Sequence, residues 1–501
     1  MVHIPKLLSK SRLMRGYQCL KSIYLTIHNK MLEPPVTPDL QAIFDQGNAV
    51  GAEARKKYPH GVMVDNPAWD FFGALKKTRD LLKNETEVIF EAAFEYKGCF
   101  ARADIIVYSK ESKRWSIYEV KSTTKVKDEH YDDVGLQAWI MANSGLPIEK
   151  ICIMHINNEC RYPYLENLFT TVDVTEELRN RHNEIPAKLN SIFKTLKSET
   201  VPDIDIGKHC SSPNDCPFMQ HCWAEKQIPS YSVFNLPLIK NKKWDLYSEG
   251  IINLDDPRLR STVELSPAQE RAVDVFISKK RHVDVAGIKN ALSSWKFPMV
   301  FLDFETINPA IPRYESTTPY QQVPFQFSAH IWHSPESELN HKEYLHIDSS
   351  DPRPELIKKL IDACAGDGSI VAYYSTFEKQ RIEELAEYSS TYRDQLNDLL
   401  SRFVDPLPIF RDFVYDNGFE GSFSLKTVAP SILGESYSYI GMLVDNGTAA
   451  QRAFEEIINP STPADRRQDL ITASLEYCKK DTLVMVELVK WLYEVKNEEQ
   501  I

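Results

Sequence analysis

Several features that would place a 501-residue chain in a familiar class are missing from this sequence. No uninterrupted apolar run is long enough to span a bilayer, and the basic start lacks the apolar core and cleavage site of a signal peptide. We therefore expect a cytoplasmic protein with no membrane partner. The phosphate-binding motif G-x-x-x-x-G-K-[ST] is absent too, so we expect no nucleotide-driven motor. The sequence shows no internal repeats and no low-complexity segment.

An excess of basic residues is also missing. The formal net charge of −12 argues against a simple basic clamp for nucleic acid. This argument is weak for enzymes that cut nucleic acids with bound cations, because Asp and Glu gather in their sites and the ions reverse the local field. Nine cysteines in a chain expected in the cytosol do not indicate disulfides, so their arrangement matters more than their number.

The length exceeds what one hydrophobic core usually supports, so we expect two or three domains. Residues 1–225 combine an amphipathic start, apolar runs bounded by turn residues and a cysteine-rich end. Residues 226–297 resemble a helical connector. Residues 298–501 alternate strand-like and helix-like segments, from the buried-strand pattern PMVFLDFE to a long terminal helix. This patterning predicts the α/β class.

Three runs rich in β-branched and aromatic residues predict consecutive strands, and a helix is expected over about 133–144. The runs are Val88–Phe94, Phe100–Tyr108 and Trp115–Val120.

An acid near the start of the second run and Glu-Val-Lys at the end of the third form the first candidate site. Glu119 and Lys121 are two apart and share a face, and a hairpin would bring Asp104 beside them. Two carboxylates can hold Mg²⁺ or Mn²⁺, while the lysine orients water and offsets charge in the transition state. The alternative is an amphipathic edge hairpin with exposed charges.

This segment resembles the PD-(D/E)xK nucleases of the RecB-like family. The resemblance implies a restriction-endonuclease-like fold in which Asp104 and Glu119 bind the metal and Lys121 is catalytic. Gln137 matches the glutamine that follows in RecB-like members. Glu91, in IFEAAF, lies where some members carry a further metal-binding acid, with a structural carboxylate as the alternative. The first helix lacks the family's histidine, which leaves any third ligand open.

Three cysteines, each separated by five residues, lie in the polar run KHCSSPNDCPFMQHCW and predict a metal-binding loop. Zinc would use three thiolates with His209, His221 or Cys19. One early cysteine and three after the nuclease core resemble the CRISPR-associated iron–sulfur nucleases, which implies a structural [4Fe–4S] cluster. The implied ligands are Cys19, Cys210, Cys216 and Cys222. The remaining cysteines lie in apolar patterns and are interpreted as packed thiols: Cys99, Cys152, Cys160, Cys364 and Cys478.

The last region carries a second set of acids. In FLDFET, Asp303 and Glu305 project on one side of a strand, and in EYCKKDT, Tyr477 lies one helical turn before Asp481. The set, with Glu378, resembles the DEDD-type 3′–5′ exonucleases of the ribonuclease H-like fold, in the subclass with Tyr-x3-Asp. The resemblance implies that the acids bind two metals and that the tyrosine positions water.

The middle motif departs from this pattern. Tyr374 stands where the family has Asn, and Glu378 stands where it has Asp. Asp405 and Lys426 are placed to face the site. The run after Glu305 resembles a bacterial domain of unknown function found beside RecB-like modules. Its aromatic residues are either base-stacking or core residues: Tyr314, Tyr320, Phe325 and Phe327.

Together these patterns favour a metal-dependent nuclease with two phosphodiester-cleaving modules that acts as an exonuclease on single-stranded or end-containing DNA. DNA is favoured over RNA as the partner, although the second fold acts on either. One alternative keeps a single catalytic module and uses the other for nucleic-acid binding. Another is a non-enzymatic nucleic-acid-binding scaffold held together by its metal cluster. Protein partners are not predicted.

Overall fold

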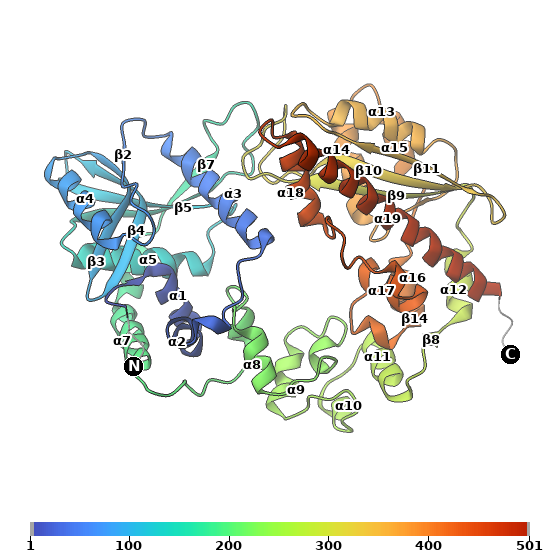
Figure 1. Cartoon of the computed structure of the whole chain (residues 1–501), viewed down its shortest axis with the longest axis horizontal. Coiled ribbons are helices and arrows are strands. Elements are labelled where there is room, and N and C mark those ends of the chain that lie inside the picture. Colours follow the sequence, from blue (N-terminus) through green and yellow to red (C-terminus); the bar gives the residue numbers. More distant parts are fainter. Residues whose placement is uncertain (1–4, 498–501) are drawn as a thin grey trace. The chain divides into compact units, whose positions relative to one another are not determined.

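The computed structural model describes residues 5–497 and divides into two compact units. The first unit comprises residues 1–227 with 309–320, and the second comprises 228–308 with 321–501. Both combine sheets and helices, which confirms the α/β prediction (Figure 1). In the described part of the chain, no helix combines the length and apolarity that crossing a membrane requires.

The first unit is built on one mixed sheet with the order β2-β3-β4-β5-β6-β7, in which β1 also pairs with β4. The three predicted strands and the hairpin between the second and third are confirmed, because β3, β4 and β5 are consecutive antiparallel neighbours. Strand β6 joins β5 in parallel after the helical crossover. The strands are β1 (Leu8–Ser9), β2 (Val62–Met63), β3 (Val88–Tyr96), β4 (Cys99–Ser109), β5 (Arg114–Lys121), β6 (Ile148–Ile156) and β7 (Phe169–Asp173).

Helix α5 (Asp128–Asn143) begins five residues before the predicted start and packs on the sheet. Asp128 and Glu129 in its first turn favour this earlier start, because acidic side chains stabilise the positive end of the helix dipole. Ile140 and Met141 are fully buried in the core of the unit. The other helices are α1 (Lys10–Gln18), α2 (Leu20–His28), α3 (Pro38–Arg55), α4 (Phe71–Lys83), α6 (Thr175–Arg181), α7 (Ile185–Leu196) and α8 (Met219–Glu225).

Residues 309–320 lie far along the chain but belong to the first unit. The backbones of Tyr162 and Thr317 hydrogen-bond at 3.0 Å, and Ala310 is buried in a cluster with Ile105. Tyr320 donates its hydroxyl to the backbone carbonyl of Ser122, one residue after Lys121. The run after Glu305 therefore completes the packing beside β5.

The second unit contains a five-stranded sheet with the order β11-β10-β9-β12-β13. Strands β9, β10 and β11 are antiparallel, whereas β12 and β13 run parallel to β9. A separate short pair joins β8 to β14. The strands are β8 (His282–Val283), β9 (Met299–Ile307), β10 (Val323–Trp332), β11 (Leu339–Leu345), β12 (Ile370–Val371), β13 (Phe403–Val404) and β14 (Val414–Tyr415).

Helix α19 (Ala464–Asn497) lies along β9 and β10 and carries the second acid motif to the sheet (Figure 1). The stretch treated above as a connector shares a core with this unit, because Val233 and Ile288 pack in one cluster with Val414 and Leu488. The other helices are α9 (Lys242–Ser248), α10 (Leu259–Thr262), α11 (Pro267–Ser278), α12 (Val285–Leu292), α13 (Arg353–Ala363), α14 (Thr376–Tyr388), α15 (Arg393–Leu400), α16 (Leu407–Phe413), α17 (Leu425–Leu433) and α18 (Gly447–Ile458).

Candidate metal centres

The first centre lies where β4 and β5 run side by side. The pairing of Ile105 with Tyr118 places Asp104 next to the end of β5, where its Oδ2 accepts a 2.6 Å hydrogen bond from the backbone N–H of Val120. The Nζ of Lys121 lies 2.9 Å from Oε1 of Glu119. The hairpin thus brings together the three predicted residues Asp104, Glu119 and Lys121.

Helix α5 adds two polar side chains to the first centre. Asp133 forms an ion pair with Lys121, and Gln137, which is fully buried, follows one turn later. The Oε1 of Gln137 accepts a 2.8 Å hydrogen bond from Lys10, the first residue of α1. We refer to Asp104, Glu119, Lys121, Asp133 and Gln137 as the first centre.

Burial, together with the nearby Glu119 carboxylate, raises the pKa of Asp104 to about 8. For Lys121, burial works against the charged form, but Glu119 and Asp133 raise its pKa above the ordinary lysine value. Lys121 therefore remains a cation at neutral pH. Within residues 5–497, the buried Oε2 of Glu119 has no hydrogen-bond partner. A buried unpaired carboxylate oxygen is costly, and a bound cation would satisfy it.

Glu91 lies beside the first centre on β3. Phe90 pairs with Ile105 and Ala92 with Ala103 in unbroken register, so Glu91 falls level with Asp104, and its φ is left-handed at 54°. A left-handed φ at a residue other than glycine costs backbone strain. The Glu91 carboxylate lies 3.9 Å from Arg55, and burial raises its pKa.

The second centre is formed by β9 and α19. One oxygen each from Asp303 and Glu305 and the sulfur of Cys478 lie within 4.8 Å of one another. The Cys478 thiol donates a 3.5 Å hydrogen bond to Oδ2 of Asp303. Burial raises the pKa values of Asp303 and Glu305 well above the ordinary range, and the charge on Asp481 adds to both shifts.

Asp481 is held by an aromatic side chain that the sequence analysis did not identify. Tyr439 donates its hydroxyl to Oδ1 of Asp481 at 2.5 Å, while burial raises the Asp481 pKa to about 6. The Nζ of Lys426 donates a 2.9 Å hydrogen bond to the Tyr477 hydroxyl, so Lys426 faces the centre. We refer to Asp303, Glu305, Glu378, Asp481 and Tyr477 as the second centre.

The substituted middle motif lies at the start of α14. Glu378 is buried, and burial raises its pKa to about 8. Its Oε2 has no hydrogen-bond partner among the described residues. Tyr374 is 61% exposed with a φ of 66°, and Asp405 accepts hydrogen bonds from the backbone N–H groups of Tyr374 and Ser375. Asp405 thus fixes the turn that begins α14.

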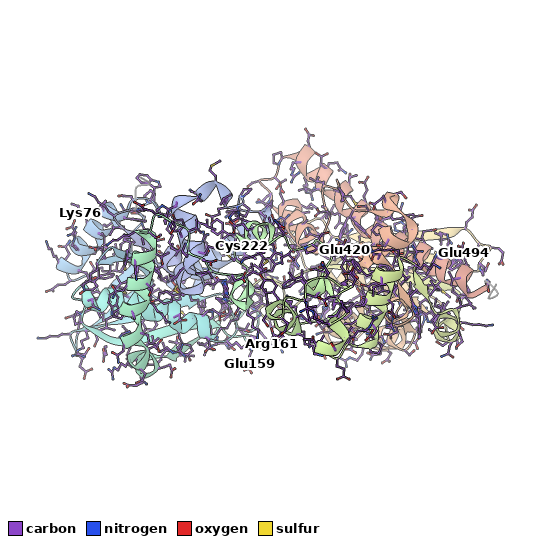
Figure 2. The ribbon with its side chains drawn as sticks, turned by 90° about the horizontal axis from the view of Figure 1, so that it is seen from below. Lys76, Glu159, Arg161, Cys222, Glu420 and Glu494 are labelled. Carbon is purple, nitrogen blue, oxygen red and sulfur yellow. The ribbon has the colours of Figure 1, made fainter. Side chains whose placement is uncertain are left out.

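The four predicted cluster ligands line one small cavity. Cys19 lies between α1 and α2. Cys222, which is labelled in Figure 2, belongs to α8. The backbone N–H of Cys216 donates to the carbonyl of Cys210 at 2.8 Å. His209 also lines the cavity, and its Nε2 is 3.7 Å from the Cys210 sulfur. Burial raises the pKa values of Cys19, Cys210 and Cys222.

Comparison with known proteins adds a domain and two distant relatives. Residues 300–424 match a family described as a domain of unknown function, DUF2779. An uncharacterized protein of Mycoplasma pneumoniae is 23% identical over 283 residues, which cover 50% of this chain and 42% of that protein. An uncharacterized protein of Ureaplasma parvum is 22% identical over 297 residues, covering 55% and 43% respectively. The chain thus spans less than half the length of these relatives.

Sequence reasoning missed four residues in or beside the centres. Asp133 precedes Gln137 by one helical turn, and this spacing alone predicts that both side chains lie on the same face of the helix. Lys10 and Tyr439 come from distant segments, and no local pattern marks them. Cys478 was interpreted as a packed thiol; it is buried as expected, but against Asp303 rather than in a purely apolar core.

The aromatic residues after Glu305 are not arranged as a stacking surface. Tyr314, Phe325 and Phe327 are buried, and Phe325 stacks on Phe454 with ring centroids 4.1 Å apart. These three are therefore core residues. Tyr320 is half-buried, with its hydroxyl directed to Ser122.

Proposed function

We propose that this chain is a metal-dependent nuclease with two phosphodiester-cleaving modules, a PD-(D/E)xK module in the first unit and a ribonuclease H-like exonuclease module in the second. The observation that carries the proposal is the burial of mutually repelling carboxylates in the second centre. Burial raises the pKa of Asp303, Glu305 and Asp481. The charge on Asp481 raises the pKa values of the other two further. Such a group is costly without cations and suits a pair of divalent ions.

The donor sets of both centres fit Mg²⁺ or Mn²⁺. Each supplies carboxylate oxygens, the ligands these hard cations prefer, and each includes a buried carboxylate oxygen without a partner among the described residues. In the first centre, Asp104 and Glu119 would hold the ion, with Glu91 as a further candidate. In the second, Asp303, Glu305, Glu378 and Asp481 would hold two. Bound ions supply Lewis-acid activation of water and charge neutralisation at the phosphate.

In the first centre, Lys121 acts as a fixed cation. Its raised pKa keeps it protonated, so it orients the attacking water and offsets negative charge on the phosphate rather than removing a proton. Gln137 is a second positioning group, because its amide is buried against the same cluster. These roles follow the RecB-like resemblance residue by residue.

In the second centre, Tyr477 positions the attacking water. Lys426 donates a hydrogen bond to the oxygen of its hydroxyl, so the hydroxyl proton points away from the lysine. Tyr439 holds Asp481 from the other side and keeps its carboxylate in one orientation. Glu378 replaces the family's Asp, and its burial and unpartnered Oε2 support a retained metal-binding role.

The cysteine cavity supports a structural [4Fe–4S] cluster bound by Cys19, Cys210, Cys216 and Cys222. Two of its walls come from α2 and α8, so a cluster there would tie the beginning of the first unit to its end. Zinc is the alternative. It would use the same thiolates, with His209 as a further donor in the cavity.

The proposal is tested with end-labelled single- and double-stranded DNA and RNA, incubated with the full chain and Mg²⁺ or Mn²⁺. The DNA substrates are expected to be cut in preference to RNA, with end-directed products from the second centre. Glu119→Gln and Asp303→Asn should each remove one class of product, and the double variant should remove both. Glu387→Gln, an exposed change on α14, is the control. Full cleavage by the double variant would exclude both centres.

A second candidate function is one catalytic module beside a nucleic-acid-binding module. The substituted motif at Tyr374 and Glu378 favours this version for the second unit. It predicts that Asp303→Asn leaves every cleavage product unchanged while Glu119→Gln abolishes them. A cytoplasmic location and DNA as the partner remain part of both versions.

A further inference from the structure

The first centre contains a lysine that neither the sequence motif nor the proposed mechanism uses. The Nζ of Lys10 lies 2.7 Å from Oε1 of Glu119, 2.8 Å from Oε1 of Gln137 and 3.1 Å from Oδ1 of Asp133. Three acceptor oxygens from two elements therefore converge on one ammonium group. Its side chain is only 18% exposed, so this is not a mobile surface lysine.

The backbone fixes Lys10 at this position. Strand β1, directly before it, pairs in parallel with β4, with Leu8 opposite Cys99 and Ser9 opposite Phe100. Leu8 is fully buried, and its N–H donates to the carbonyl of Gly98 at 2.8 Å. The next residue enters α1 beside the end of the sheet that carries the acids. The fold thus delivers this ammonium group to the first centre.

Lys10 and a divalent ion would compete for the same ligand atom. Oε1 of Glu119 already accepts from both Lys10 and Lys121, whereas Oε2 has no hydrogen-bond partner within residues 5–497. An ion bound by both oxygens of Glu119 would bring a third cation, with two charges, to an oxygen that already contacts two ammonium groups, and the added repulsion would displace one of them. Lys121 comes from the same strand as Glu119, whereas Lys10 reaches in from α1.

We propose that Lys10 is an internal competitor for the divalent cation of the first centre, occupying its ligands in the metal-free protein and setting the metal concentration at which the centre loads. This inference rests on the proposed function, because it takes Glu119 to be a metal ligand. Lys10 neutralises the buried acids while no metal is bound, and it must turn away from Glu119 and Gln137 as the ion enters. The centre therefore loads at a higher metal concentration than its acids alone would require.

The test measures Mn²⁺ binding to the full chain by calorimetry and by the loss of the free-ion electron paramagnetic resonance signal. All proteins carry Asp303→Asn to weaken the second centre. Lys10→Met should bind Mn²⁺ at the first centre about tenfold more tightly or better, because one adjacent positive charge has been removed. Lys10→Arg keeps the charge and should stay close to the parent. Lys6→Met, an exposed change four residues earlier, is the matched control.

Thermal unfolding provides a second readout that is independent of the binding measurement. Lys10→Met should unfold at a lower temperature than the parent in chelator, and saturating Mn²⁺ should raise its midpoint by more than it raises the parent's. Equal or weaker Mn²⁺ binding by Lys10→Met, with an unchanged gain in midpoint, would overturn the inference alone. If Glu119→Gln changes Mn²⁺ binding in neither background, the proposed function of the first centre fails as well.

Discussion

Glu378 offers a quantitative test of how far the second centre depends on bound cations. Burial raises its pKa to about 8 from the ordinary glutamate value of 4.5. A carboxyl group with a raised folded-state pKa contributes fully to stability below its unfolded pKa, and the contribution is lost as pH rises through the folded value. In metal-free protein, the ionisation of Glu378 should therefore destabilise the second unit progressively up to about pH 8.

The size of this effect follows from the two pKa values. Between about pH 5.5 and about pH 8.5, an acid that shifts from 4.5 to about 8 on folding loses about 3 kcal/mol of stability. Glu378→Gln removes the ionisation but keeps the shape of the side chain. Its free energy of unfolding should therefore fall less than that of the wild type across this interval, by about the same 3 kcal/mol.

Equilibrium urea unfolding in chelator, at both pH values, measures this difference. Glu387→Gln is the control, because Glu387 is exposed on the same helix. The other acids of the second centre titrate in both proteins, so the difference between the two reports the ionisation of Glu378 together with its repulsion of Asp303 and Glu305. If Glu378→Gln and the wild type lose the same free energy of unfolding between the two pH values, the pKa of Glu378 is not raised by burial. The argument that this carboxylate needs a bound cation would then fail.

Three further predictions concern other groups of the centres. Lys121→Met should reduce cleavage by the first centre by about 10²-fold or more while leaving Mn²⁺ binding in place, as single-turnover assays and calorimetry would show. Tyr439→Phe should move the acidic limb of the pH profile of second-centre activity to higher pH. The reason is that Asp481, whose pKa burial raises to about 6, loses a hydrogen bond that favours its charged form. An unchanged pH profile would contradict this. Cys216→Ser should remove the brown colour of anaerobically purified protein and lower the unfolding temperature of the first unit, whereas Cys364→Ser should keep the colour.

The parts of the first centre that depend on local order could be predicted from the sequence. Alternation along a strand places Glu119 and Lys121 on one face, and the hairpin length brings Asp104 to them. Helical spacing does the same for Asp133 and Gln137. Each of these relations involves residues within one element or one turn, where the chain itself limits the geometry.

The contacts that could not be predicted depend on packing between distant segments. Lys10 reaches the first centre only because β1 pairs with β4, and a two-residue strand leaves almost no periodic signal. Tyr439 reaches Asp481 from a loop that no pattern marks. Cys478 has the apolar neighbours of a packed thiol, and only the approach of α19 to β9 places its sulfur beside Asp303.

The two centres balance their buried acids in different ways, and this difference bears on how each would respond to metal. In the first, Lys10 and Lys121 both contact Glu119 and Asp133, so protein cations already offset much of the acidic charge. In the second, Lys426 contacts the hydroxyl of Tyr477 rather than a carboxylate, and the acids lower their cost by holding protons. Metal binding in the first centre therefore displaces a lysine as well as the proton of Asp104, whereas in the second it displaces protons alone. Metal affinity should accordingly rise with pH at both centres, and only the first should respond to removal of a competing ammonium group.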